Sequence, residues 1–215
     1  DRYLTQGYQS GGSQTQLPAG LYLHWLLPKA LATLRQSPLL ENRLALPAVP
    51  NRWLVTRTES SGDKKQWIVE SDALISPPDF EPDFGDSTDL HTQYPIPLPF
   101  IDEKMNDAMK GDIYQYRFMG RQTQLEEWPR ADVLEYLEDY YPHGLTAIGY
   151  GDPTFSSVFS NCSSVFGFSD TDIAKGQVHK STLSESIRYD VLGWYSDPAR
   201  DCLRNFLVEP SLTTD

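Results

Sequence analysis

Two β-rich runs separated by a short polar loop constrain this chain more than any other feature. Trp53-Leu54-Val55-Thr56 and Gln66-Trp67-Ile68-Val69 combine β-branched and aromatic residues, and Ser60-Ser61-Gly62-Asp63 lies between them. Runs of this composition joined by a loop that contains Gly are typical of a β-hairpin. The sequence therefore predicts a hairpin here and places both tryptophans in one sheet, without fixing the register.

Other segments add strands and a few helices. Strand patterns are expected at 20–27, 113–119, 145–148, 165–168 and 187–195, and helices at 28–34, 129–141 and 197–207. The last helix has Asp197 as its N-cap and Pro198 as its first residue. Because helices do not alternate regularly with strands, a doubly wound parallel sheet is disfavoured. We expect an α+β fold with a largely antiparallel β-sheet core, about three helices and long Pro-rich loops.

The domain organisation is expected to be simple. Residues 1–19 are rich in Gln, Ser, Gly and Thr, which indicates a flexible lead-in or a loop. Residues 20–210 then form a single α+β domain, since apolar elements run through them without a clean linker. Within it, residues 76–103 hold six prolines and seven acidic side chains. We expect this stretch to be a long ordered loop, and loops of that length usually serve function or are mobile.

Charge excludes some partners. With 30 acidic and 18 basic residues the formal charge is -12 and the isoelectric point is near 4.7. Such a chain repels phosphate backbones, so nucleic acid is not an expected partner. No apolar run approaches 18 residues, so no transmembrane segment is expected. Residues 1–5 do not resemble a signal peptide and the chain does not begin with Met, so we expect a fragment of a longer protein whose compartment stays open.

Few residues suggest catalysis. Nucleotide-binding, HExxH and GxSxG motifs are missing from the sequence. The catalytic candidates are His24 with Cys162, as base and nucleophile, and the carboxylates Asp152 and Asp170, which follow predicted strands. The alternatives are structural: His24 as a hydrogen-bonded residue of a sheet, the aspartates as turn residues, and Cys162 as a buried thiol or bonded to Cys202.

One acidic run suggests a cation. Asp79, Glu81, Asp83 and Asp86 bring hard oxygen ligands close together along the chain, which is what Ca²⁺ requires. An EF-hand loop starting at Asp79 would need Gly and Glu at its sixth and twelfth positions, and this sequence departs from both. An irregular calcium site is therefore one hypothesis, and a solvated acidic loop is the other.

Aromatic residues suggest a contact surface. The chain has five Trp, twelve Tyr and nine Phe. Tyr and Trp are common anchors of binding surfaces, and sugars stack on them. Tyr114 and Tyr116 on a predicted strand, with Tyr140 and Tyr141 at the end of a predicted helix, are the candidate binding residues for protein or glycan.

Several stretches resemble a family of very long, uncharacterised bacterial proteins. The matching segments are Gly20-Leu21-Tyr22-Leu23-His24-Trp25-Leu26-Leu27-Pro28, Pro47-Ala48-Val49-Pro50-Asn51-Arg52-Trp53-Leu54-Val55, and residues 145–152, 161–168 and 189–198. They touch most of the chain, in order. The resemblance implies an N-terminal domain followed by further domains, and it brings no activity or functional residue with it.

These observations favour a non-enzymatic binding or assembly module of a larger bacterial protein, which contacts protein or glycan through aromatic-rich loops. Two alternatives stay open. One is a hydrolase that uses carboxylates or a Cys–His pair, and the other is a structural component of a secreted or injected particle.

Overall fold

The computed structural model describes residues 2–4, 8–9, 16–17, 20–36, 44–75, 96–97, 116–128, 140–141, 144–147, 165–173 and 187–201. Strands dominate these residues, and none of them belongs to a helix of seven or more residues. The expected α+β class with about three helices is therefore wrong, while the expectation of a largely antiparallel sheet is confirmed.

The larger sheet has five strands in the order β12-β7-β8-β10-β9, all antiparallel to their neighbours. Its strands are β7 (Arg52–Thr58), β8 (Lys64–Ile75), β9 (Ile96–Pro97), β10 (Tyr116–Gln124) and β12 (Arg188–Trp194). The predicted hairpin is confirmed as β7–β8, with Trp53 opposite Val69 and Val55 opposite Trp67. A register shift in β10 falls at Gly120, which has a φ of 94° that glycine adopts without strain.

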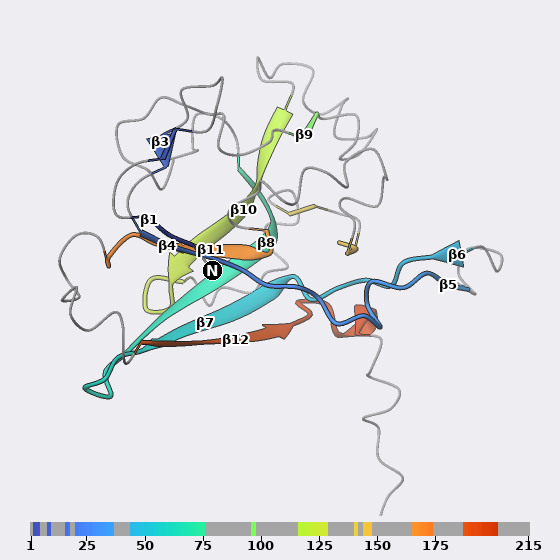
Figure 1. Ribbon diagram of the computed structural model, residues 1–215. Coiled ribbons are helices and arrows are strands. Elements are labelled where there is room, and N and C mark those ends of the chain that lie inside the picture. Colours follow the sequence, from blue (N-terminus) through green and yellow to red (C-terminus); the bar gives the residue numbers. More distant parts are fainter. Residues whose placement is uncertain are drawn as a thin grey trace, which may run out of the picture.

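A smaller sheet lies against the first. It has three strands in the order β1-β4-β11, namely β1 (Arg2–Leu4), β4 (Gly20–His24) and β11 (Gly167–Asp170). Figure 1 shows β4 and β11 crossing over the strands of the larger sheet. Two short ribbons complete the fold, β2 (Tyr8–Gln9) with β3 (Gln16–Leu17), and β5 (Arg35–Gln36) with β6 (Leu44–Ala45).

The core fills the space between the two sheets. Trp53 and Trp67 from the larger sheet meet Trp25 and Phe168 from the smaller one, with ring centroids 5.2 Å apart for Trp25–Trp53 and 4.8 Å for Trp67–Phe168. Aromatic pairs at such distances contribute about 0.5–1.5 kcal/mol each beyond the area they bury. Gly193 on β12 is part of the same packing, since a Cβ there would lie 2.3 Å from Trp53 Cζ3. A glycine inside this strand therefore marks a close approach.

Within the described residues, two of the three predicted helices are present only as single turns. Residues 28–34 form a turn in which Leu31 N–H bonds Pro28 O at 2.8 Å, and Leu34 stays exposed. Near the C-terminal end, Asp197 caps a 3₁₀ turn, η9 (Pro198–Arg200), through its bond from Ala199 N–H at 2.8 Å. A helix of this length depends on burying an apolar face, and in the first segment Leu31 packs against the core while Leu34 stays exposed. The third predicted helix lies mostly outside the described residues, and Tyr140 within it forms a β-bridge with Ala73.

The structure describes parts of the N-terminal segment and of the acidic Pro-rich loop. The N-terminal segment predicted to be flexible contains β1, which pairs with β4, while β9 is the described part of the acidic Pro-rich loop. Among the described residues, no helix is long and apolar enough to cross a membrane.

Candidate functional site

The side chain of Gln122 is one of the contacts that join the two sheets. In an antiparallel ladder alternate residues bond to one neighbour, and the residues between them turn their N–H and C=O groups the other way. At Ser169 on β11 these groups meet the side chain of Gln122 on β10, whose Nε2 donates to Ser169 O at 3.0 Å and whose Oε1 accepts from Ser169 N at 3.1 Å. The amide thus satisfies β11 in the way that a neighbouring strand would, and it fixes the gap between β10 and β11.

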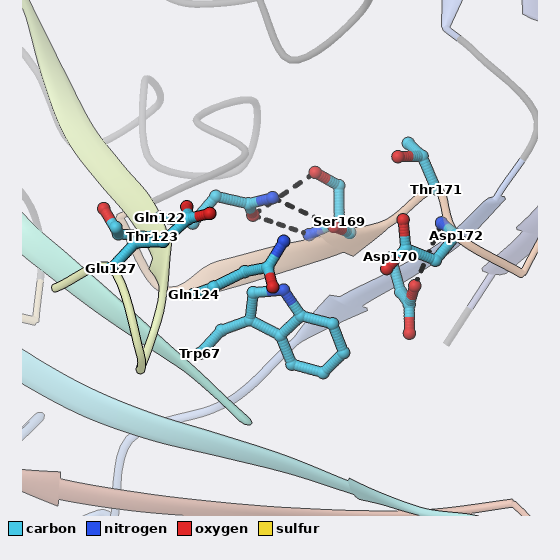
Figure 2. A pocket seen from close by; sticks show the side chains of 9 residues that line it. All are labelled: Trp67, Gln122, Thr123, Gln124, Glu127, Ser169, Asp170, Thr171 and Asp172. Carbon is cyan, nitrogen blue, oxygen red and sulfur yellow. Dashed lines mark hydrogen bonds between the residues drawn. The ribbon is translucent and has the colours of Figure 1, made fainter. Parts of the chain in front are cut away.

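This gap opens into a polar pocket of about 270 Å³. Figure 2 shows it between the end of β10 and the end of β11, with Trp67 from β8 as its one aromatic wall. Its lining residues are Trp67, Gln122, Thr123, Gln124, Glu127, Ser169, Asp170, Thr171 and Asp172. We call it the seam pocket, because it lies where the two sheets meet.

Asp170 anchors the seam pocket electrostatically. Its side chain is 2% exposed and its Oδ2 accepts from Arg57 Nη1 at 2.6 Å and from the Tyr189 hydroxyl at 2.7 Å, while its Oδ1 accepts from the Asp172 N–H at 3.2 Å. Burial by itself lowers the pKa of Arg57, but attraction to Asp170 outweighs it and leaves that pKa raised. Burial, and then the negative Asp170, raise the pKa of Tyr189. Arg57 therefore stays a cation and Tyr189 a neutral phenol near neutral pH.

The indole wall of the seam pocket has three close neighbours. The Trp67 ring packs on Phe168, while the Arg57 guanidinium and the Lys65 ammonium lie 5.5 Å and 5.4 Å from its centroid. Lys65 also forms an ion pair with Asp172 at the rim, where both side chains are partly exposed. A buried, doubly contacted ring keeps a fixed orientation, so this wall is preorganised for a ligand.

One polar group in the seam pocket is uncommitted. The Gln124 side chain is half-buried, and within the described part of the chain its amide makes no hydrogen bond. Figure 2 places this amide over the Trp67 ring, beside the Gln122–Ser169 contact. It offers a donor and an acceptor to a bound molecule, and the exposed carboxylate of Glu127 lies on the same wall.

Of the catalytic candidates, Asp170 lies in the seam pocket and His24 does not. His24 is opposite Gly167 in the β4–β11 ladder and Asp170 is opposite Leu21, so the two are three positions apart, or about 10 Å. The imidazole of His24 is exposed, and desolvation by neighbouring protein is the main cause that lowers its pKa. The structure therefore does not bring His24 and Asp170 together as a base with its carboxylate.

The tyrosine candidates divide between core and an ionic cluster. Tyr141 is buried in the hydrophobic core. Tyr140 donates its hydroxyl to Glu70 Oε1 at 2.8 Å, and Arg121 Nη2 binds the other Glu70 oxygen at 2.6 Å. Burial, followed by the negative charge of Glu70, raises the pKa of Tyr140 to about 12.

The same cluster continues along β7 and β8. The Arg52 guanidinium lies 4.6 Å from the centroid of the Tyr140 ring and pairs with Asp72, which also accepts from Asn51 Nδ2 at 2.6 Å. In β8, Glu70 and Asp72 alternate with Trp67, Val69 and Ser71. This cluster therefore lies on the face of the larger sheet opposite the seam pocket, and the Tyr140 hydroxyl is held within it.

The structure does not describe the side chains of the remaining candidate site residues. Tyr116 begins β10, and its side chain is not described. Outside the described residues lie Tyr114, Asp152, Cys162, Cys202 and the calcium candidates Asp79, Glu81, Asp83 and Asp86. The calcium site stays a prediction, and no group of three His, Cys, Asp or Glu side chains suited to a metal occurs among the described residues.

Sequence reasoning missed most of the seam pocket. Trp67 was predicted as a residue of the hairpin, while Gln122, Gln124 and Asp172 were not singled out. One signal was present: Asp170-Thr171-Asp172 places two carboxylates two residues apart at the end of a strand, where residues i and i+2 share a face. The glutamines carried no local signal, because their role depends on which strand lies opposite.

Comparisons with protein-family models, with curated proteins and with solved structures return no match. The case for a function therefore depends on the geometry of the seam pocket itself.

Proposed function

We propose that this chain is a non-enzymatic binding module and that its seam pocket holds the terminal sugar of a glycan. The observation that carries the proposal is the combination of an indole wall with an uncommitted Gln124 amide. A sugar presents C–H groups that can contact the part of the Trp67 ring left accessible, which is 6% of the residue, and hydroxyl groups for amides and carboxylates. Trp67, Gln124 and Asp172 supply these three kinds of group within one pocket.

Size and solvation support a small, polar ligand. At about 270 Å³ the seam pocket is at the lower limit of ligand sites, which span about 300–1,000 Å³. Eight of its nine lining residues are polar, so an apolar ligand would leave their donors and acceptors unpaired. Three carboxylates line the pocket. The cations Arg57 and Lys65 are already paired with two of these carboxylates, so the pocket disfavours an anionic ligand.

The state of Asp170 supports binding over hydrolysis. A general base needs a free lone pair within reach of a substrate proton. The Asp170 carboxylate already accepts three hydrogen bonds on its two oxygens and Arg57 is fixed against it, so little of its accepting capacity is left for a substrate proton. Asp170 therefore shapes the pocket and holds Arg57 against the Trp67 wall, which is a positioning role.

The test is a titration of the 215-residue chain with neutral sugars selected on a glycan array. In a ¹H–¹⁵N spectrum we expect saturable shifts of the Trp67 indole N–H and the Gln124 amide signals. Replacing Gln124 with Ala removes one or two hydrogen bonds of about 0.5–1.5 kcal/mol each, so the dissociation constant should rise by roughly 3- to 100-fold.

The matched control is Gln66→Ala. Gln66 lies on β8 next to Trp67, but its side chain points to the opposite face and donates to Thr56 Oγ1 at 3.0 Å. This variant should bind the sugar as the parent chain does. If both variants weaken binding equally, or if no sugar shifts the Trp67 and Gln124 signals at millimolar concentration, the seam pocket is not a glycan site.

A further inference from the structure

Two lining residues of the seam pocket, Gln124 and Glu127, belong to one tight turn. Gln124 ends β10, and its carbonyl oxygen accepts from the N–H groups of Glu127 at 3.0 Å and Trp128 at 2.9 Å. A hydrogen bond between residues three apart closes a β-turn, whose first and last Cα atoms lie within about 7 Å of each other. The turn therefore holds Glu127 beside the uncommitted Gln124 amide, at the β10 end of the pocket in Figure 2.

Glu127 differs from the other two carboxylates that line the seam pocket. Asp170 is bound by Arg57, and Asp172 forms its ion pair with Lys65. Glu127 is exposed, and within the described part of the chain its side chain has neither an ion pair nor a hydrogen bond. The β11 end of the pocket is thus neutralised by cations of the chain itself, whereas the β10 end keeps a carboxylate without a cation.

The charges around the seam pocket favour a cation. The charged side chains that line the pocket or pair with its lining comprise four carboxylates and two cations, Glu59, Glu127, Asp170, Asp172, Arg57 and Lys65. Their formal charge is therefore -2. A cleft with an excess of one sign of charge attracts ligands of the opposite sign. An ammonium group suits the β10 end in particular, because it donates three hydrogen bonds and accepts none.

Building on the proposed glycan binding, we propose that the seam pocket selects an amino sugar, and that Glu127 is the residue that determines this specificity. The ammonium group of the sugar binds the Glu127 carboxylate, with the Gln124 amide oxygen as a second acceptor. The ring then extends toward Asp172, whose carboxylate accepts from the hydroxyl groups. The unequal charge of the two ends of the pocket therefore also fixes the direction in which the sugar lies.

The expected preference is moderate, because Glu127 is exposed. An exposed ion pair stabilises a complex only weakly, while a charge-assisted hydrogen bond in a more enclosed site contributes more. Between these limits, we expect the protonated amino sugar to bind about three- to tenfold more tightly than the neutral sugar of the same shape. Raising the salt concentration should reduce this ratio, because salt screens the attraction between ammonium and carboxylate.

The test compares three ligands in ¹H–¹⁵N titrations of the 215-residue chain at about pH 6, where an aliphatic amine is protonated. Glucosamine carries the charge, glucose lacks the nitrogen, and N-acetylglucosamine keeps the nitrogen without the charge. We expect glucosamine to bind more tightly than both neutral sugars and to shift the Glu127 and Gln124 signals. Ethanolamine, an amine without a sugar ring, should bind more weakly than glucosamine.

Glu127→Gln and Glu126→Gln form a matched pair of variants. Glu126 is exposed and lies on the same turn, but it does not line the seam pocket. Each substitution removes one negative charge from adjacent positions, and circular dichroism verifies that both variants are folded. Glu127→Gln should bring the ratio of the affinities for glucosamine and glucose close to one, while Glu126→Gln should keep the ratio of the parent chain.

The outcomes separate this inference from the proposed function. If glucose binds the parent chain as tightly as glucosamine, the amino-sugar specificity is overturned and the glycan site stands. If none of the sugars shifts the Trp67 and Gln124 signals, or if ethanolamine binds as tightly as glucosamine, the glycan site itself is overturned. An equal fall of the ratio in Glu126→Gln and Glu127→Gln would assign the preference to the overall acidity of the chain and refute the role of Glu127.

Discussion

Replacing Asp170 with Asn should destabilise the protein strongly, because it leaves a buried cation without its main partner. The side chains of Arg57 and Asp170 are both almost fully buried, and their 2.6 Å contact joins residues 113 positions apart. Asn keeps the shape and still accepts from the Tyr189 hydroxyl, but it has no charge. The substitution therefore isolates the electrostatic contribution to the junction between β7 and β11.

The size of the effect follows from the surroundings of Arg57. Breaking a buried ion pair by removing one partner costs about 3–5 kcal/mol. Arg57 retains an ion pair with Glu59 at 2.9 Å, and Glu59 is partly exposed, so the cost should be near the lower limit, about 3 kcal/mol. With a urea m-value of about 2 kcal/mol/M, the unfolding midpoint falls by about 1.5 M. Urea unfolding followed by tryptophan fluorescence measures this shift.

Two companion variants make the result decisive. Asp190→Asn removes an exposed partner of Arg188, and it should change the free energy of unfolding by less than about 0.5 kcal/mol. Combining Asp170→Leu with Arg57→Met removes both charges, and it should recover most of the stability lost in Asp170→Asn. If Asp170→Asn and Asp190→Asn cost the same, or if the double variant is the least stable, the Arg57–Asp170 pair does not hold the sheets together.

Three other outcomes are expected. Gly193→Ala should lower the free energy of unfolding by about 1–3 kcal/mol in thermal or urea unfolding, because the added methyl group overlaps an indole ring 2.3 Å away. Gln122→Ala should cost about 1–3 kcal/mol and increase hydrogen exchange at the Ser169 N–H, which loses its acceptor, while Gln66→Ala leaves that exchange unchanged. Tyr140 has a folded pKa of about 12 against 10 when unfolded, so its contribution to stability is complete below pH 10 and is lost as the pH rises through 12. The phenolate absorbance difference between the folded parent and Tyr140→Phe should therefore titrate near pH 12. A difference that titrates near pH 10 contradicts the contact with Glu70.

Local sequence patterns predicted the main strands of the two sheets and predicted the helices poorly, and the strand expected at 145–148 is absent from the described residues 145–147. The β7–β8 hairpin follows from neighbouring residues, because β-branched and aromatic runs and a Gly-containing loop act within a few positions of each other. Asp197 was identified as a cap, and it does cap a turn. How far that turn continues depends on tertiary packing, which a capping signal does not contain.

The seam pocket was largely invisible to sequence analysis because its contacts are long-range. Asp170 was noticed as a carboxylate at the end of a strand, but its partner Arg57 comes from β7, and only the stacking of the two sheets brings them together. Trp67 shows the same limit. Its place in the hairpin was correctly predicted, yet its position beside a pocket depends on where β10 and β11 end.

The bond between Gln122 and Ser169 has a consequence for solubility. Exposed strand edges recruit other extended chains and so promote aggregation, and natural sheets usually protect them with charges, prolines or bulges. Here one amide side chain occupies the N–H and the C=O of Ser169, which denies that position to an incoming strand. This contact between the two sheets therefore also acts as a guard against misassembly, and losing it would increase the tendency of the chain to form insoluble β-rich aggregates.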